Sequence, residues 1–223
     1  EVAIKVLEVD QADVTELHHE INILKTCQNQ FVVGYRGCWC KGRYVWIVME
    51  YCAGGSLGDL LLLCDFVLTE KECKAVMYLT LHGLAYLHQR HLIHRDIKAA
   101  NILLTRDGIC KLGDFGVSAE LTSTMAKRKT AVGTPYWMAP EMLSSSEYDS
   151  KADIWSLGIT AYELCSGDPP HASQHPMRVL FLIPSSPSPV IPEAETYSKE
   201  FNDFLAQSLQ TDPVLRPDAL SLL

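Results

Sequence analysis

The chain has 223 residues, of which 48% are hydrophobic and 21% are charged, and its net charge is −8. This length suits one large domain or two small lobes around a substantial core. The acidic balance argues against a protein that binds nucleic acid through unspecific charge attraction. No apolar run approaches the roughly 18 residues of a membrane-spanning helix, so we expect no membrane insertion.

The first fifty residues alternate between strand and helix patterns. Residues 1–8 predict a strand, and because the chain opens inside this pattern without an initiator Met, we expect a fragment of a longer protein. Apolar residues at helical spacing predict a helix from Val14 to Cys27. β-branched and aromatic residues predict strands over Phe31–Gly37 and Tyr44–Met49, with a turn at Lys41–Arg43.

After residue 55 the pattern becomes mainly helical. Thr69 and Glu72 have the spacing of a capping box in front of one helix. Further helices are predicted from about Ser150 to Gly167 and from about Ser198 to Leu209. The Pro/Ser-rich stretch 184–192 is a connector, either an ordered loop or a disordered linker. A small mixed part followed by a larger helical part indicates two lobes with a ligand cleft between them.

Eight cysteines are spread along the chain without the spacing of a zinc site. Cys38 and Cys40 form the closest pair, and a strand would place both on one face. Scattered thiols in a chain of this size indicate a reducing compartment, so we expect a cytoplasmic protein rather than a secreted disulfide framework.

Three motifs between His94 and Glu141 supply the groups that phosphoryl transfer needs. They read His-Arg-Asp-Ile-Lys-Ala-Ala-Asn from residue 94, Asp-Phe-Gly from residue 114 and Ala-Pro-Glu from residue 139. A fourth, Val-Ala-Ile-Lys, begins at residue 2, and a strand there directs Ala3 and Lys5 to the same side.

With these motifs in this order, the chain resembles the eukaryotic protein kinases from Val2 to about Leu222. The resemblance implies an α+β, two-lobed fold with a small β-rich N-lobe in residues 1–51 and a large, mainly helical C-lobe in residues 52–223. The family's first two strands and Gly-rich loop would precede Val2, so we expect an N-terminally truncated kinase domain. If that truncation were native, a noncatalytic scaffold or pseudokinase would be the alternative.

The resemblance assigns the reacting groups residue by residue. Asp96 would be the catalytic base, acting largely by orienting the substrate hydroxyl. Lys98 would offset charge on the transferred phosphoryl group, and this Asp-x-Lys arrangement is typical of Ser/Thr kinases. Asn101 and Asp114 would be the oxygen ligands of Mg²⁺.

ATP binding falls to the small lobe and its border. Lys5 would reach phosphate oxygens, held by a carboxylate on the helix after the first strand. The family pattern favours Glu20 for this partner, and Glu16 one turn earlier is the alternative. The resemblance implies that the adenine site is lined by Ala3, Met49 as gatekeeper, backbone groups of Glu50 and Cys52, and Leu103.

A regulatory switch is expected between Asp114 and Glu141. The resemblance places Thr130 at the activating position, where its phosphorylated form would pair with Arg95 and order the segment. Thr134 would hydrogen-bond Asp96 and Lys98 instead. The competing interpretation of Thr130 is an unmodified residue in a solvated loop.

Two further pairings are expected to be structural. The resemblance pairs Glu141 with Arg216, and it implies that Asp153 holds the backbone of the catalytic loop. Breaking a buried pair of this kind costs about 3–5 kcal/mol.

Stretches such as Gly-Thr-Pro-Tyr-Trp-Met-Ala-Pro-Glu from residue 133 and His-Pro-Met-Arg from residue 175 are similar to the sterile-twenty-like group. The nearest match is its germinal-centre branch of Hippo type. This implies Ser/Thr protein substrates in intracellular signalling, with Val117 favouring threonine. ATP and Mg²⁺ are the expected cofactors, no nucleic acid is expected, and a homodimer for trans-autophosphorylation is the expected assembly.

Overall fold

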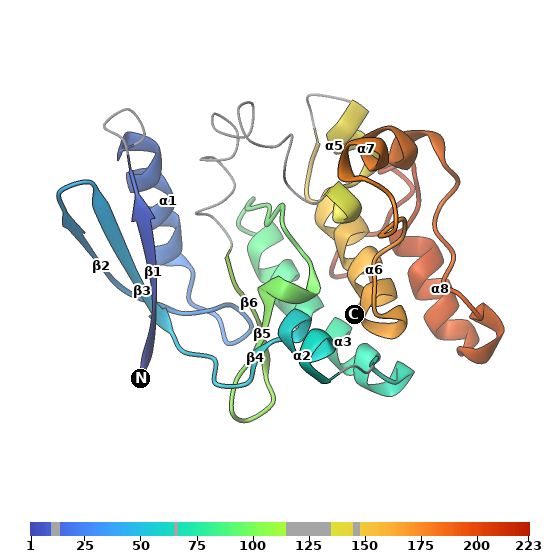
Figure 1. Cartoon of the computed structure of the whole chain (residues 1–223), viewed down its shortest axis with the longest axis horizontal. Coiled ribbons are helices and arrows are strands. Elements are labelled where there is room, and N and C mark those ends of the chain that lie inside the picture. The colour runs from blue at the N-terminus through green and yellow to red at the C-terminus, as the bar shows by residue number, and fades with distance from the viewer. Residues whose placement is uncertain (10–13, 65–66, 115–134, 145–147) are drawn as a thin grey trace.

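The computed structural model describes residues 1–9, 14–64, 67–114, 135–144 and 148–223. A three-stranded antiparallel sheet of order β1-β3-β2 stands at one end of the molecule, with helix α1 beside it (Figure 1). The strands are β1 (Val2–Glu8), β2 (Tyr35–Lys41) and β3 (Tyr44–Glu50), and α1 spans Val14–Thr26. The predictions for β1, α1 and β3 are therefore confirmed.

The strand predicted over Phe31–Gly37 is wrong in its bounds. Strand β2 starts at Tyr35 and continues to Lys41, where Gly42 closes the hairpin with φ 61°. The residues before it form an isolated bridge to Leu112 of the second sheet, where Val33 N donates to Leu112 O at 2.9 Å. Val32 and Val33 are buried there, so their β-branched pattern reflects burial between two sheets rather than pairing in β2.

A second small sheet lies between the first sheet and the helices (Figure 1). Its strands are β4 (Gly55–Ser56), β5 (Ile102–Leu104) and β6 (Cys110–Leu112), all paired antiparallel. The motifs of interest flank these short strands, because the His94–Asn101 stretch precedes β5 and Asp114 follows β6.

The helical part is built around α6 (Lys151–Ser166), in which thirteen of sixteen residues are buried. The other helices are α2 (Leu57–Cys64), α3 (Glu70–His88), α5 (Pro140–Ser144), α7 (Pro176–Ser185) and α8 (Lys199–Ser208). Short 3-10 turns span Ala99–Asn101, Pro135–Trp137 and Ala194–Thr196. Most polar side chains of this buried helix are hydrogen-bonded, as buried polar groups usually are, whereas the buried Trp155 Nε1 has no hydrogen-bond partner.

The predicted helices α3, α6 and α8 are confirmed with their caps. Thr69 and Glu72 form the capping box of α3, Gly167 ends α6 at φ 91°, and Ser198 caps α8. The predicted start of the connector 184–192 is wrong, since Pro184 and Ser185 are the last residues of α7. Between α7 and α8 the chain is ordered in the structure, which agrees with the ordered-loop alternative.

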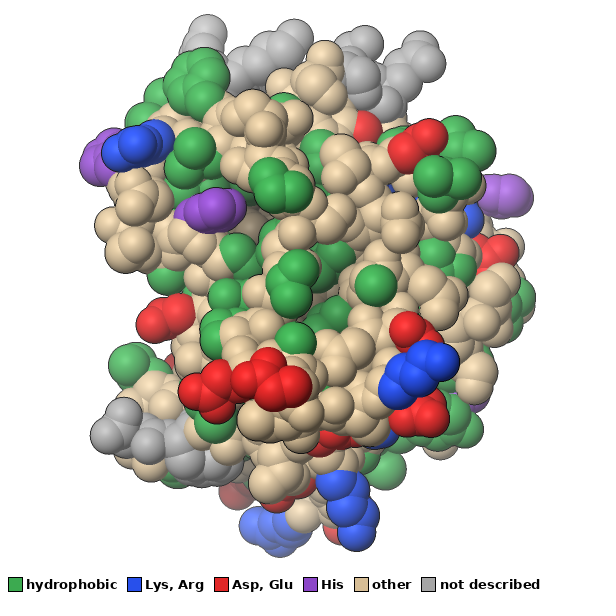
Figure 2. Space-filling model, turned by 90° about the vertical axis from the view of Figure 1, so that its right-hand side faces the viewer, with side chains coloured by type: hydrophobic (Ala, Val, Ile, Leu, Met, Phe, Trp, Pro, Cys, Tyr) green, Lys and Arg blue, Asp and Glu red, His purple; other side chains and the backbone are tan. Residues whose placement is uncertain are grey.

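The α+β fold with a small sheet region and a helical region is confirmed, while the boundary between residues 51 and 52 stays a prediction. Figure 2 faces the end that carries α7 and α8, where hydrophobic side chains reach the surface in several small groups. Phe181 of α7 is the most exposed large one on these two helices, at 75%. Among the described residues, none of the helices has the length and apolar character needed to cross a membrane.

Candidate active site

Asp153 on α6 fixes the backbone of the His94–Asn101 loop. Its carboxylate has no exposed surface and accepts the N–H groups of His94 and Arg95, both at 2.8 Å. His88 Nε2 approaches the same carboxylate at 2.8 Å. Burial raises the pKa of Asp153, but the hydrogen bonds from His88 and from the His94 backbone help to outweigh it, so the pKa is lowered and the group stays ionised. The contact predicted for Asp153 is present.

His94 joins this loop to the end of β6. Burial lowers its pKa, so the ring is neutral near pH 7. Its Nδ1 accepts from Asp96 N at 3.3 Å, and its Nε2 lies 3.0 Å from Gly113 O. We assign the Nε2–H tautomer from these two contacts. The imidazole thereby holds the Asp96 loop next to the residue that precedes Asp114.

Asp96, Lys98 and Asn101 form one polar cluster. Lys98 Nζ lies 2.9 Å from Asp96 Oδ2, and Asn101 Nδ2 donates to the same oxygen at 2.7 Å. Asn101 Nδ2 also donates to Asp96 O at 2.7 Å. These bonds fix the orientation of the Asp96 carboxylate. They also engage the amide nitrogen of Asn101, so its amide oxygen can accept from, or bind, another group.

Lys5 and Asp114 meet across the two sheets, with Nζ 2.8 Å from Oδ1. Both side chains keep solvent contact, at 27% and 45% exposure. Asp114 has φ 56°, and Arg95 has φ 71°, a region that non-glycine residues seldom occupy. Strained backbone of this kind gathers at functional sites. The α1 backbone includes Glu20 and Glu16, but their side chains lie outside the described residues, so the Lys5–Glu20 pairing stays a prediction.

The residues predicted around adenine fall on three elements. Ala3 of β1 stands directly opposite Met49 of β3, and both are half-buried. Glu50 ends β3, and Cys52, which is buried, accepts from Gly55 N at 3.1 Å. Leu103 belongs to β5 of the second sheet, opposite Lys111. The first four positions thus lie on the first sheet or just after it, whereas Leu103 lies on the second sheet.

Glu141 and Arg216 form the pair that the sequence predicted. Arg216 Nη1 and Nη2 bond the two carboxylate oxygens at 2.7 and 3.1 Å, and Arg216 is 1% exposed. Thr130, Thr134 and Val117 lie outside the described residues, so their predicted roles stay predictions. Arg95 is described, with its guanidinium 5.7 Å from the centre of the Tyr148 ring.

Two polar side chains beside the site were not predicted from the sequence. Glu163 of α6 accepts from Ala99 N and from Trp137 Nε1. The Glu50 side chain bonds Lys111 Nζ at 2.9 Å, although only its backbone was predicted to act. A usable signal existed for Glu163, since it is a carboxylate in the middle of a buried apolar helix, where an unpaired charge is costly.

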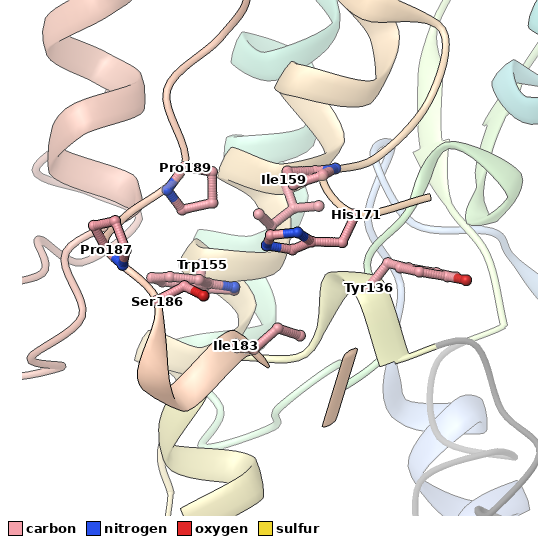
Figure 3. A pocket seen from close by; sticks show the side chains of 9 residues that line it. Tyr136, Trp155, Ile159, His171, Ile183, Ser186, Pro187 and Pro189 are labelled. Atoms are coloured by element: carbon pink, nitrogen blue, oxygen red, sulfur yellow. The ribbon is translucent and has the colours of Figure 1, made fainter. Parts of the chain in front are cut away.

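A separate cavity lies against α6 and α7, with about 280 Å³ of space including its open mouth (Figure 3). Its walls come from prolines, aromatic rings and isoleucines: Tyr136, Trp155, Ile159, Pro170, His171, Ile183, Ser186, Pro187 and Pro189. None of these is among the predicted site residues. The cavity is therefore a feature of the helical lobe and not the place where the polar clusters meet.

The protein kinase domain family matches residues 1–223, the whole chain. The chain belongs to the protein kinase family. Serine/threonine-protein kinase cst-1 of Caenorhabditis briggsae is 52% identical over 221 residues, and cst-1 of Caenorhabditis elegans is 51% identical. Serine/threonine-protein kinase hippo of Drosophila melanogaster is 50% identical over 222 residues.

These alignments cover 99 to 100% of the kinase domain but only 44%, 44% and 33% of the three relatives. The chain therefore spans less than half the length of the curated relatives it matches. Their names agree with the resemblance to the Hippo-type branch, which is confirmed. Protein kinases use ATP as a substrate. The residues of the clusters around Lys5 and Asp96 belong to the sequence motifs on which the resemblance to this family was based.

Proposed function

We propose that this kinase domain transfers the γ-phosphoryl group of ATP to serine and threonine hydroxyls of protein substrates, with a preference for threonine, in intracellular signalling. One observation carries the proposal: the Asp96–Lys98–Asn101 cluster and the Lys5–Asp114 pair are held together through Gly113. Gly113 N donates to Asn101 O at 2.9 Å, and Gly113 O faces His94. Positioning and electrostatics supply most of the catalysis in phosphoryl transfer.

Asp96 receives the substrate hydroxyl in this mechanism. Asn101 and Lys98 both contact its Oδ2, so the carboxylate keeps one orientation and its other oxygen is directed to the nucleophile. Lys98 stands 2.9 Å from Asp96 and offsets charge on the phosphoryl group as the oxygen–phosphorus bond forms. The hydroxyl proton passes to Asp96, and ADP leaves with the electrons of the broken bond.

The residues present fit a magnesium ion. Asn101 has its amide nitrogen engaged by Asp96, which leaves the amide oxygen for a cation. Asp114 supplies a carboxylate that is 45% exposed. We propose that Asn101 and Asp114 hold Mg²⁺, which when bound neutralises phosphate charge. Lys5, adjacent to Asp114, is then placed to contact phosphate oxygens, while Ala3, Met49, Glu50, Cys52 and Leu103 line the adenine site.

The Asp96→Asn variant tests the mechanism in the full-length protein that carries this chain. We expect phosphorylation of a basic protein substrate to fall by about 10²-fold or more, because the hydroxyl loses its acceptor. ATP affinity should stay near that of the wild type, since Asp96 contacts the nucleophile and not the nucleotide. Radiolabel transfer and nucleotide titration measure the two quantities.

Asp107→Asn is the matched control, since Asp107 is exposed in the turn between β5 and β6. Turnover by the Asp96 variant equal to that of this control would refute the assignment. If the wild-type protein transfers no phosphate to the substrate, the alternative of a noncatalytic scaffold or pseudokinase is favoured instead.

We further propose that phosphorylated Thr130 pairs with Arg95 and switches the domain on. The support is the placement of Arg95, whose backbone N–H is held by Asp153 directly beside Asp96. Thr130→Ala should lower the activity of the activated protein by at least about tenfold, the effect of losing 1.4 kcal/mol of charge-assisted bonding. Thr130→Ser keeps a phosphate acceptor and should retain activity. Equal activity of the two variants would show that the switch lies elsewhere.

We infer a cytoplasmic location and a homodimer that phosphorylates itself in trans. All eight cysteines are free, which supports a reducing compartment. The inactive Asp96→Asn chain offers the test of the dimer, since wild-type protein should phosphorylate it at Thr130. An Asp96→Asn chain that stays unmodified in the mixture would contradict transfer between chains, and cell fractionation checks the location.

A further inference from the structure

Cys38 and Cys40, the closest pair of cysteines in the sequence, have no role in the proposed kinase mechanism. Both belong to β2, an edge strand of the three-stranded sheet at the outer end of the molecule (Figure 1). Cys38 lies opposite Ile47 of β3 and Cys40 lies opposite Val45, and both of these partners are buried. The two thiols therefore lie on one face of the strand, as the sequence predicted, and it is the face that packs toward the core.

The sulfur of Cys38 lies in a polar cluster. The Cys38 thiol hydrogen-bonds the Cys40 thiol, and the Tyr35 hydroxyl hydrogen-bonds Cys38. Helix α1 packs against β2, and Lys25 in the last turn of α1 brings a positive charge near Cys38. Both thiols are free, and because Cys40 is exposed and Cys38 is half-buried, a small ion can reach the pair from solvent.

Two neighbouring thiolates are unfavourable here unless a cation lies between them. Burial raises the pKa of Cys38 and the adjacent Cys40 thiol raises it further, while Lys25 and Tyr35 lower it without fully compensating. A metal ion bound by both sulfurs removes the repulsion between the thiolates, and a thiol that coordinates a metal ion is deprotonated outright. The cluster therefore offers two soft ligands with one positive side chain beside them.

The number of ligands decides which ion fits. Structural zinc takes four ligands in a tetrahedron. Among the described residues, no group of three or more His, Cys, Asp and Glu side chains could hold a metal ion, so the pair has no third ligand of these types there. Sulfur ligands suit Cu⁺ as well as zinc and iron–sulfur clusters. Of these, Cu⁺ is the one that two thiolates satisfy, because its filled d shell accepts two ligands on opposite sides.

A disulfide is the competing product of two adjacent thiols, and the strand geometry opposes it. Residues two apart in a strand have Cα atoms about 6.4–6.8 Å apart, which is the long limit of the range of roughly 4.4–6.8 Å found for disulfides. Closing the bond would bring the sulfurs to about 2.05 Å and strain β2. A bridging ion leaves the sulfurs farther apart and preserves the pairing of β2 with β3.

We propose that Cys38 and Cys40 bind one Cu⁺ ion as a two-coordinate dithiolate at the edge of the small sheet. Binding releases two protons, and the resulting complex of Cu⁺ with two thiolates carries one negative charge, which Lys25 offsets. The copper stays monovalent, so the step consumes no oxidant or reductant. The inference does not rest on the proposed kinase activity, because its test measures metal binding and not phosphoryl transfer.

The test is anaerobic titration of the full-length protein that carries this chain with Cu⁺, in reduced glutathione and against a chromogenic Cu⁺ chelator. We expect the wild type to withdraw one equivalent of Cu⁺ from the chelator, and native mass spectrometry to show one bound ion. Cys38→Ser and Cys40→Ser should each lower the affinity for Cu⁺ by more than about 100-fold, because loss of an outer-shell partner alone costs about 10–100-fold.

Cys64→Ser is the matched control, since it removes an exposed thiol from α2, away from the pair, and should bind Cu⁺ as the wild type does. Thermal melts without metal check that the serine variants are folded. Their melting temperatures should stay close to that of the wild type, because each replaces a thiol that is exposed or half-buried by a hydroxyl of similar size.

Lys25→Met tests the charge beside the site. We expect the affinity for Cu⁺ to fall by about tenfold, as on loss of an outer-shell partner, because the negative charge of the dithiolate is then no longer offset. Lys199→Met, at an exposed position of α8, makes the same change of charge far from the pair in sequence and should leave the affinity unchanged.

Tight Cu⁺ binding that survives in the Cys38→Ser/Cys40→Ser double variant overturns the inference, and so does an equal loss in Cys64→Ser. A Cys38–Cys40 disulfide that glutathione does not reduce also overturns it, in favour of a redox pair. Tighter binding of Zn²⁺ than of Cu⁺ would do the same, since it would require further ligands. An unchanged affinity in Lys25→Met overturns the part assigned to that lysine.

Discussion

A single buried side chain, Asp153, stabilises an otherwise unfavourable backbone. It accepts two successive loop N–H groups, and the second belongs to Arg95, whose φ is 71°. An uncompensated buried charge costs several kcal/mol, so the loop must keep the conformation that offers both donors. The charge and the strained backbone therefore stabilise each other. The loop that carries Asp96 is thereby anchored to α6, which is buried along most of its length.

Motif spacing predicted most residues of the polar clusters, and the reason is local. Asp96, Lys98 and Asn101 are close in sequence, so their contacts follow from one turn. Glu163 was missed because its partners come from two distant segments and its own neighbours are apolar. The Lys5–Asp114 contact was also unforeseen, since the sequence paired Lys5 with a glutamate of α1 whose side chain is not described. The carboxylate that Lys5 contacts depends on how the two lobes pack against each other, which motif spacing does not reveal.

At the scale of elements, helix α7 was not predicted from the sequence, because Pro184 indicated a connector. Proline inside a helix removes one hydrogen bond, and its appearance in a Ser/Pro-rich stretch indicated a connector. The structure places it one residue before the end of α7, where a single lost bond is tolerated. Pro176 opens the same helix, where its missing N–H costs nothing, behind the cap of His175. The pattern at the start of α7 was therefore as informative as the proline at its end.

The first turns of α3 and α8 are joined by Glu70. Its carboxylate accepts from the Ser198 hydroxyl, from Ser198 N at 2.8 Å and from Lys74. The bonds from Lys74 and Ser198 lower the pKa of Glu70 to about 2. A lowered pKa gives stability that is present above the unfolded value near 4.5 and is lost as pH falls toward 2.

Glu70→Gln should therefore lower the melting temperature at pH 7, with the difference from the wild type shrinking below pH 4.5. Thermal melts between pH 7 and pH 2.5 measure it. Glu200→Gln, an exposed first-turn residue of α8, is the control that keeps the same change of charge. A difference that is constant over the whole pH range would show that the carboxylate charge of Glu70 contributes nothing.

At the scale of the whole molecule, the small sheet is fastened to the second sheet by Glu50 and Lys111. Glu50 ends β3, Lys111 is the central residue of β6, and their side chains are only 24% and 12% exposed. Glu50 Oε2 also accepts Gly34 N–H at 3.1 Å. Burial raises the pKa of Glu50, but Lys111 and the Gly34 N–H lower it by more, so the carboxylate is ionised at neutral pH.

Lys111→Met leaves that carboxylate half-buried with one donor instead of two. We expect the free energy of unfolding at pH 7 to fall by about 1–3 kcal/mol, the cost of a buried acceptor that loses a charged partner. Because the backbone of Glu50 is also proposed to contact adenine, the KM for ATP should rise along with the loss of stability. Urea unfolding followed by tryptophan fluorescence and initial-rate kinetics measure the two effects.

Lys199→Met, at an exposed position of α8, controls for the loss of a positive charge and should change stability by less than about 0.5 kcal/mol. The double variant Glu50→Gln/Lys111→Met removes the stranded charge and should recover part of the stability. Since the lowered pKa of Glu50 gives stability above pH 4.5 that disappears in acid, the cost of Lys111→Met should shrink as pH falls below that value. An undiminished cost at pH 3, with no recovery in the double variant, would mean that the lysine acts through packing of its stem and that the two sheets are joined by apolar contact alone.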